Sequence, residues 1–170
     1  MATTDFTKRP EFLKGRAAEL RVARWLQEHG FFIIPSYDYS GADGNKAPRL
    51  QGLAAGHAVP DLDVSRAGVR KWVEVKSKAE ANTWRSSEPW GTPFTPEHGI
   101  DHSNYLDYLK VKRITGDEVW IAIYEESTGF LLVAEIDALG KPRIGSWLGK
   151  PIANWPRDRF KVVILAHDAA

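Results

Sequence analysis

The 170-residue sequence predicts one domain of the α/β or α+β class, with helices packed on a mixed sheet. The length is close to the roughly 150 residues expected for one domain. Hydrophobic residues make up 43% and charged residues 26% of the chain, as in ordinary globular proteins. Two segments with helical character are separated by short apolar or alternating segments, in the order helix, three strands, helix, strand.

Turn and capping residues set the expected boundaries. Pro10 suits the first position of a helix, and Gly30 suits the position after its last turn. Ala67 and Gly68 separate two alternating segments, which is typical of a hairpin. Gly116 predicts the end of the second helix. In chain order we expect a helix at 10–29, a strand at 31–37, a loop at 40–58, a hairpin of 60–66 and 69–77, an irregular connection at 78–99, a helix at 103–115, a hairpin of 119–125 and 130–136, and a last strand at 159–166.

Composition excludes several classes of site. No apolar run is long enough to span a membrane and no secretory signal begins the chain, so a cytoplasmic location is expected. The absence of cysteine excludes disulfides, thiolate zinc sites and cysteine nucleophiles. A metal ion would therefore be held by oxygen or imidazole ligands.

Charge is unevenly distributed although the net charge is only +1. Residues 114–140 contain six acids and no Lys or Arg. Residues 141–161 form a basic stretch, which either builds a basic face or consists of solvated loop residues. Its cations are Lys141, Arg143, Lys150, Arg157, Arg159 and Lys161.

The expected hairpin at 60–77 carries the chemically informative residues. Glu74 and Lys76 lie one residue apart on its second strand, so their side chains point to the same face. Closure of the hairpin brings Asp61 or Asp63 beside Glu74, and the sequence leaves this choice open. Two carboxylates and a main-chain carbonyl provide the oxygen ligands that Mg²⁺ prefers.

Glu19 adds a carboxylate from the first expected helix. At about 100° per residue it falls at the centre of an apolar stripe. Because an unpaired buried carboxylate is costly, this position calls for a metal, a cation or a hydrogen-bond network. Pairing with Arg16 at the edge of the stripe is the alternative. The stripe comprises Phe12, Gly15, Val22, Ala23 and Leu26.

Glu19, the residues PD at 60–61 and the residues EVK at 74–76 together resemble the PD-(D/E)xK phosphodiesterase superfamily. This superfamily includes restriction endonucleases, Holliday junction resolvases and phage exonucleases. The resemblance covers roughly residues 10–125. It implies a restriction-endonuclease-like αβββαβ core, with a mixed central sheet flanked by helices and extra C-terminal strands, in a single domain of residues 1–170.

The resemblance also implies roles for individual residues. Asp61, Glu74 and the Val75 carbonyl would bind Mg²⁺ or Mn²⁺, and Glu19 would complete the site directly or through water. Lys76 would orient or help deprotonate the attacking water and stabilise the charge that develops on the phosphate.

The implied function is a metal-dependent nuclease that hydrolyses DNA phosphodiester bonds as an endonuclease. A nucleic-acid-binding or assembly module of the same fold, without cleavage, is the alternative. The presence of Asp61, Glu74 and Lys76 favours the enzyme. An RNA substrate, the preferred DNA structure and the cutting polarity stay open, as does whether a homodimer or a partner protein supplies specificity.

The second expected helix presents Tyr105, Tyr108 and Lys112 as one stripe, opposite Leu106 and Leu109. In the superfamily this helix borders the substrate groove, so the stripe would contact a phosphate backbone. A solvated amphipathic face is the alternative.

Two further groups surround this helix. His98 and His102 flank its start and are expected at the surface, with contact to a phosphate as the alternative. An aromatic cluster in the preceding connection suits either stacking on unpaired bases or packing onto the domain. It comprises Trp84, Arg85, Trp90 and Phe94.

Overall fold

The computed structural model describes residues 9–35, 57–84 and 95–164. Helix α1 spans Pro10–Glu28 and helix α2 spans His102–Thr115. The strands are β1 (Phe32–Pro35), β2 (Leu62–Arg66), β3 (Val69–Lys78), β4 (Asn82–Trp84), β5 (Thr95–Asp101), β6 (Glu118–Glu125), β7 (Phe130–Glu135), β8 (Arg143–Trp147), β9 (Lys150–Pro156) and β10 (Lys161–Ile164), with the short 3₁₀ helix η3 (Arg157–Arg159) before β10.

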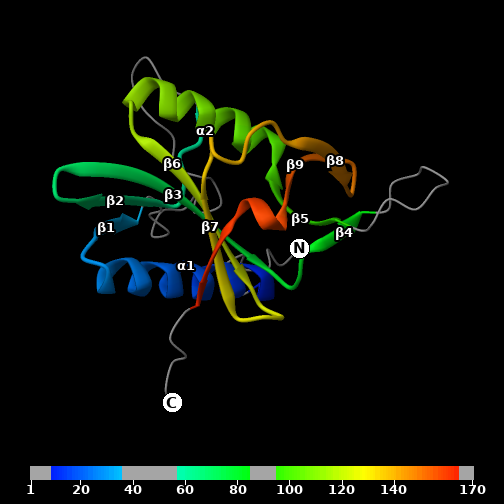
Figure 1. Cartoon of the computed structure of the whole chain (residues 1–170), viewed down its shortest axis with the longest axis horizontal. Helices are drawn as coiled ribbons and strands as arrows, with labels where there is room; N and C mark the ends of the chain where they lie inside the picture. Colours follow the sequence, from blue (N-terminus) through cyan, green and yellow to red (C-terminus); the bar gives the residue numbers. More distant parts are fainter. Residues whose placement is uncertain (1–8, 36–56, 85–94, 165–170) are drawn as a thin grey trace, which may run out of the picture.

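The strands form two sheets (Figure 1). The larger sheet has the order β1-β2-β3-β6-β7-β10, and the smaller one has the order β4-β5-β9-β8. Strands β3 and β6 are parallel, whereas the other pairs of the larger sheet are antiparallel. A parallel pair needs a long crossover, and the chain between β3 and β6 supplies it through β4, β5 and α2.

The two helices cover opposite faces of the larger sheet (Figure 1). Val22 and Leu26 of α1 belong to one apolar cluster with Val73 and Val75 of β3. Tyr108 and Val111 of α2 belong to the other cluster, together with apolar residues of β6 and of the smaller sheet. Since side chains alternate along β3, Glu74 lies on the α2 face.

These features confirm the predicted fold class: a mixed sheet with helices on both faces and extra C-terminal strands. The prediction of an irregular connection at 78–99 is wrong for the described residues. They contain the last residue of β3, the whole of β4 and most of β5. The connection before the last strand is also a hairpin, β8–β9. Pro96, Pro151 and Pro156 lie at or next to strand ends, where the lost N–H is tolerated. Of the last strand expected at 159–166, Lys161–Ile164 form β10 and Arg159 ends η3, while residues 165–166 lie outside the described residues.

Parts of the expected organisation fall outside the described residues. They are most of the loop at 40–58 and the residues Arg85, Trp90 and Phe94.

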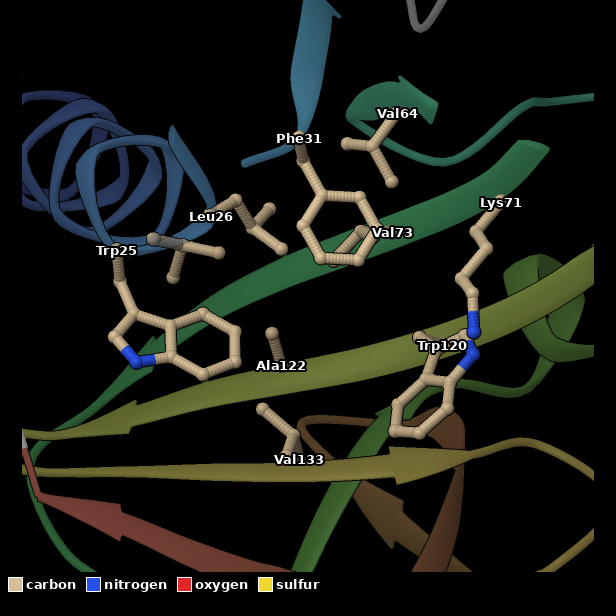
Figure 2. A pocket seen from close by; sticks show the side chains of 10 residues that line it. Trp25, Leu26, Phe31, Val64, Lys71, Val73, Trp120, Ala122 and Val133 are labelled. Atoms are coloured by element: carbon tan, nitrogen blue, oxygen red, sulfur yellow. The ribbon is translucent and has the colours of Figure 1, made fainter. Parts of the chain in front are cut away.

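An apolar cavity of about 120 Å³ lies between α1 and the sheet (Figure 2). Trp25 and Phe31 line it from the α1 side, and Val73 and Trp120 line it from the strands. The cavity therefore opens on the face opposite to Glu74. Within 9–35, 57–84 and 95–164, no helix is long and apolar enough to cross a membrane.

Candidate active site

An interruption in strand pairing creates the site at one edge of β3. Strand β2 begins at Leu62, opposite Val73, so it does not pair with the following residues of β3. Asp61 takes the place of the missing strand, because the Val75 N–H donates to its Oδ2 at 2.8 Å. The N–H and C=O of a strand residue point to the same edge, so the Val75 carbonyl also faces the Asp61 side.

Glu74 is buried on the α2 face with no exposed area, and Asp61 is only 4% exposed. The Tyr108 hydroxyl donates to Glu74 Oε2, and the Lys76 ammonium pairs with Glu74 Oε1. Burial raises the pKa of Glu74 to about 7, and the nearby Asp61 carboxylate adds to this shift. The two carboxylates are therefore held together at an energetic cost that a bound cation would relieve.

Lys76 lies between the buried Glu74 carboxylate and solvent. Its side chain is 32% exposed, while its ammonium contacts the buried Glu74 carboxylate. Burial works to lower the pKa of Lys76, but the negative charges of Glu74 and Asp61 outweigh it and raise the pKa above its usual value. The lysine is therefore positively charged at neutral pH.

Lys78 extends the same face and was not singled out by the sequence analysis. It follows Lys76 by two positions on β3, so both side chains point to the α2 side. Burial lowers the pKa of Lys78, and the charge of Lys76 lowers it further, while Asp101 acts in the opposite direction. The sequence signal that could have identified Lys78 is its alternation with Glu74 and Lys76 along one strand.

Glu19 approaches the site from α1. The apolar stripe of the helix is centred on Ala18, Val22 and Leu26, so Glu19 flanks the stripe rather than occupying its middle. Its Oε2 accepts a hydrogen bond from Arg16 Nη1 at 2.8 Å. Burial raises the pKa of Glu19, although Arg16 opposes this, and the charges of Lys76 and Glu74 also act on it.

The carboxylates do not close into a complete metal cage. Among the residues that the structure describes, no three acidic or histidine side chains are grouped closely enough to hold a metal ion. Asp61 and Glu74 form the core of the site, and Glu19 stands nearby, paired with Arg16.

Asp63 is engaged elsewhere. Arg70 donates to both of its carboxylate oxygens, at 2.9 and 2.7 Å. In the strand register Asp63 lies opposite Trp72, not opposite Glu74. The local geometry thus favours Asp61 over Asp63 as the partner of Glu74.

The orientation expected for α2 is wrong. Tyr108 is 1% exposed and donates to Glu74, and Tyr105 is partly buried in the core, whereas Leu106 is 43% exposed. Lys112 is ion-paired with Glu135 and Asp137. The predicted substrate-facing stripe is therefore the core-facing stripe, because the tyrosine rings bury large apolar surfaces and the hydroxyl of Tyr108 finds a buried acceptor.

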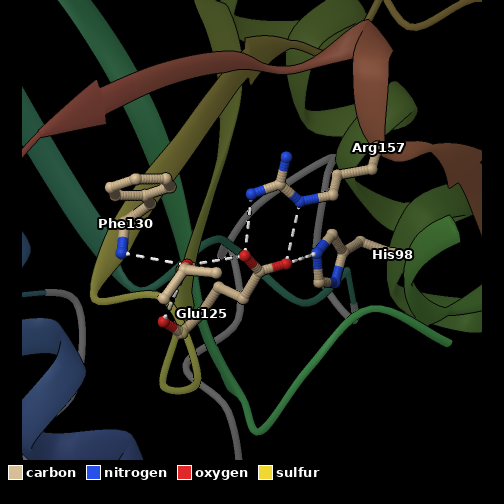
Figure 3. A network of polar contacts seen from close by, with 5 residues as sticks. His98, Glu125, Phe130 and Arg157 are labelled. Atoms are coloured by element: carbon tan, nitrogen blue, oxygen red, sulfur yellow. Dashed lines mark hydrogen bonds and ion pairs between the residues drawn. The ribbon is translucent and has the colours of Figure 1, made fainter.

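A second buried carboxylate lies nearby, at the end of β6 (Figure 3). Arg157 donates from Nε and Nη2 to Glu125 at 2.9 and 2.8 Å, and Thr128 donates at 2.6 Å. His98 Nε2 lies 2.9 Å from the same carboxylate and is 1% exposed, so its expected surface position is wrong. The hydrogen bonds from Arg157 lower the pKa of Glu125 to about 2. This network joins β5, β6 and η3.

Two cations of the basic stretch thus form ion pairs with buried carboxylates. Arg157 binds Glu125, and Arg143 Nε binds Glu97 at 3.1 and 3.0 Å. Arg159 and Lys161 are exposed.

No protein-family model matches the chain, and no curated protein sequence is significantly similar to it. Its structure has a restriction-endonuclease-like fold, with a mixed central sheet and helices on both faces. A similar solved structure is that of Hjc, a Holliday junction resolvase from Archaeoglobus fulgidus. It has a TM-score of 0.52 and 14% identity, over 86% of this chain and 91% of the resolvase. A nuclease from a fusselovirus also matches, with a TM-score of 0.43 and 13% identity, over 95% of this chain and 89% of the nuclease.

Proposed function

We propose that this chain is a metal-dependent nuclease that hydrolyses DNA phosphodiester bonds as an endonuclease. One observation carries the proposal: the buried carboxylates of Asp61 and Glu74 stand together at an open edge of β3, with the Lys76 ammonium beside them. The fold shared with the solved structure of a Holliday junction resolvase supports it.

The residues present suit Mg²⁺ or Mn²⁺. Asp61, Glu74 and the Val75 carbonyl would hold the ion, and Glu19 would contribute through water. All of these donors are oxygen atoms, and the mutual repulsion that raises the pKa of Glu74 favours a divalent cation between the carboxylates. When bound, the metal would lower the pKa of its water and neutralise phosphate charge.

The chain's own residues would then act as follows. Lys76 keeps its proton, so it stabilises the negative charge that develops on the phosphate and orients the attacking water by donation. The raised pKa of Lys76 argues against deprotonation of that water by the lysine. Tyr108 fixes the orientation of the Glu74 carboxylate, and Lys78 is placed to contact a phosphate on the same face.

The test is a cleavage assay with the full chain. Supercoiled, linear, single-stranded and branched DNA, and RNA of matched sequence, are incubated with Mg²⁺, Mn²⁺ or EDTA. We expect DNA cleavage with either metal and none in EDTA. Cleavage of RNA alone would change the substrate class. Binding of DNA without cleavage under every condition would favour the non-cleaving module.

Two isosteric variants then test the metal ligands. Asp61→Asn should abolish metal-dependent cleavage, because it removes one charge of the carboxylate pair. Asp63→Asn is the matched control and should keep most of the activity, since Asp63 is bound by Arg70. Full activity of folded Asp61→Asn, checked by circular dichroism, would contradict the assignment.

A further inference from the structure

The β8–β9 hairpin ends in an exposed apolar tip. The hairpin tip consists of Trp147, Leu148 and Gly149, of which Trp147 is 66% and Leu148 88% exposed. Leu148 is the most exposed of the large hydrophobic residues in the described ranges. Neither side chain contributes to the clusters of the core.

The backbone of the hairpin tip does not favour leucine. Leu148 and Gly149 have φ values of +49° and +77°, a pair of positive angles typical of tight hairpin turns. Asn, Asp and Gly adopt such angles readily, whereas leucine does so at a cost. The β2–β3 turn has nearly the same angles at Ala67 and Gly68, +49° and +79°. A residue without a branched side chain thus suffices for this turn, and the exposed leucine calls for an explanation other than folding.

The hairpin tip extends past the end of β5, beyond Asp101. In the smaller sheet Ile152 of β9 lies opposite Asp101, and Lys150 lies opposite Trp147. Two further residues of β9 and the turn therefore carry the tip about 10 Å beyond the end of β5. The charge of Asp101 acts on Lys76 and Lys78. Figure 1 shows the hairpin next to β5 and the start of α2.

The surroundings of Trp147 are polar. Trp147 lines a hollow of about 340 Å³ together with Glu80, Asn82 and Asn154, and with Arg143, which is held by Glu97. Lys150 follows the turn directly and is exposed. An aromatic surface, hydrogen-bonding groups and a flanking cation are the combination that binds unpaired bases and their phosphates.

We propose that the hairpin tip binds an unpaired nucleobase at a branched or partly single-stranded site, with Leu148 inserted beside the last base pair and Trp147 stacked on the displaced base. Lys150 contacts a neighbouring phosphate. Two side chains offer far less than the roughly 800 Å² per partner of a stable protein interface, so a second copy of the chain fits this surface less well. The choice of nucleic acid as ligand rests on the proposed function.

The experiment measures binding of the full chain in EDTA, by fluorescence anisotropy of labelled DNA. Three probes share one sequence: a blunt duplex, the same duplex with a bulge of unpaired nucleotides, and the single strand. Trp147→Ala should weaken binding to the bulged and single-stranded probes about tenfold, the scale of one lost base–aromatic stack, and change duplex binding less than about twofold. Trp147→Phe should retain most of the affinity.

A second variant separates a binding role from a structural one. Leu148→Asn should raise the melting temperature, because asparagine tolerates the positive φ, and yet reduce the preference for the bulged probe several-fold. Ala67→Asn is the matched control at the equivalent turn. It should raise the melting temperature and leave the binding preference unchanged.

Three results would overturn the proposal: equal affinity losses for all three probes, no loss for any of them, or a Trp147→Ala variant whose main effect is a lower oligomeric state by sedimentation. Because binding in EDTA needs no cleavage, a wild-type chain that binds the bulge but never cuts would refute only the nuclease proposal. If the wild-type chain cut DNA but substitutions in the hairpin tip changed no binding, only the hairpin-tip proposal would be refuted.

Discussion

Glu74 and Glu125 are both buried on the same face of the larger sheet, on the neighbouring strands β3 and β6. Their relative exposures are 0% and 2%, yet their pKa values move in opposite directions, to about 7 and about 2. Burial alone therefore does not decide the state of these two carboxylates.

Their neighbours make the difference. Glu125 accepts two hydrogen bonds from Arg157 and one from Thr128, and no carboxylate contributes to its pKa shift. Glu74 has Tyr108 and Lys76 as partners, but the Asp61 carboxylate opposes its ionisation. The charge of Glu125 is satisfied within the molecule, whereas Glu74 is opposed by Asp61 despite its contact with Lys76. This contrast separates a structural carboxylate from a candidate catalytic one.

Removal of the cation at Glu125 should have the largest effect on stability. Arg157→Gln leaves the buried Glu125 carboxylate without its main partner, so the free energy of unfolding should fall by about 3–5 kcal/mol. Urea denaturation measures it. The double variant Glu125→Gln, Arg157→Gln should regain part of the loss, because no uncompensated charge remains. A loss below about 1 kcal/mol would mean that the network is not structurally important.

Glu74→Gln should reduce activity without reducing stability. The cleavage rate should fall by two or more orders of magnitude, the scale for loss of a group that stabilises the transition state. The melting temperature should stay the same or rise, because a strained buried charge is removed. Glu125→Gln is the matched control, with lower stability and near-normal activity of the folded protein. If both variants changed the cleavage rate and the melting temperature in the same way, the two carboxylates would not differ in role.

The pH dependence of stability in EDTA should also carry opposite signs for the two residues. The pKa of Glu125 is lower in the folded state, so its contribution of about 3 kcal/mol is present above pH 4.5 and is lost as the pH falls toward 2. The pKa of Glu74 is higher in the folded state, so its contribution declines as the pH rises from 4.5 to 7. Unfolding free energies across this range for wild type, Glu74→Gln and Glu125→Gln should show that each variant loses its own pH-dependent part.

The smallest expected effect concerns the exposed end of the basic stretch. Arg159 and Lys161 are exposed, whereas Arg157 is held by Glu125 and belongs to the structural network. Replacement of Arg159 and Lys161 by Gln should reduce the slope of log affinity against log salt by up to about two units if both contact phosphates. DNA titrations at several salt concentrations measure the slope. An unchanged slope would assign both side chains to solvent.

The sequence by itself determined the two helices, the strands of the larger sheet and the central motif. Alternation along 69–77 placed Glu74 and Lys76 on one face, because strand periodicity is a local property that any pairing of β3 preserves. Capping and turn residues located α1 and the β2–β3 hairpin to within a residue or two for the same reason.

Tertiary structure decided which groups meet. Arg70 occupies Asp63 and leaves Asp61 to Glu74, and Tyr108 turns inward to the same carboxylate. The pairing of β5 with β9 in the second sheet and the contact of Glu125 with Arg157 join segments more than thirty residues apart. Such pairings leave no periodic trace in the sequence, because they follow from the packing of distant elements and from the need of buried charges for partners.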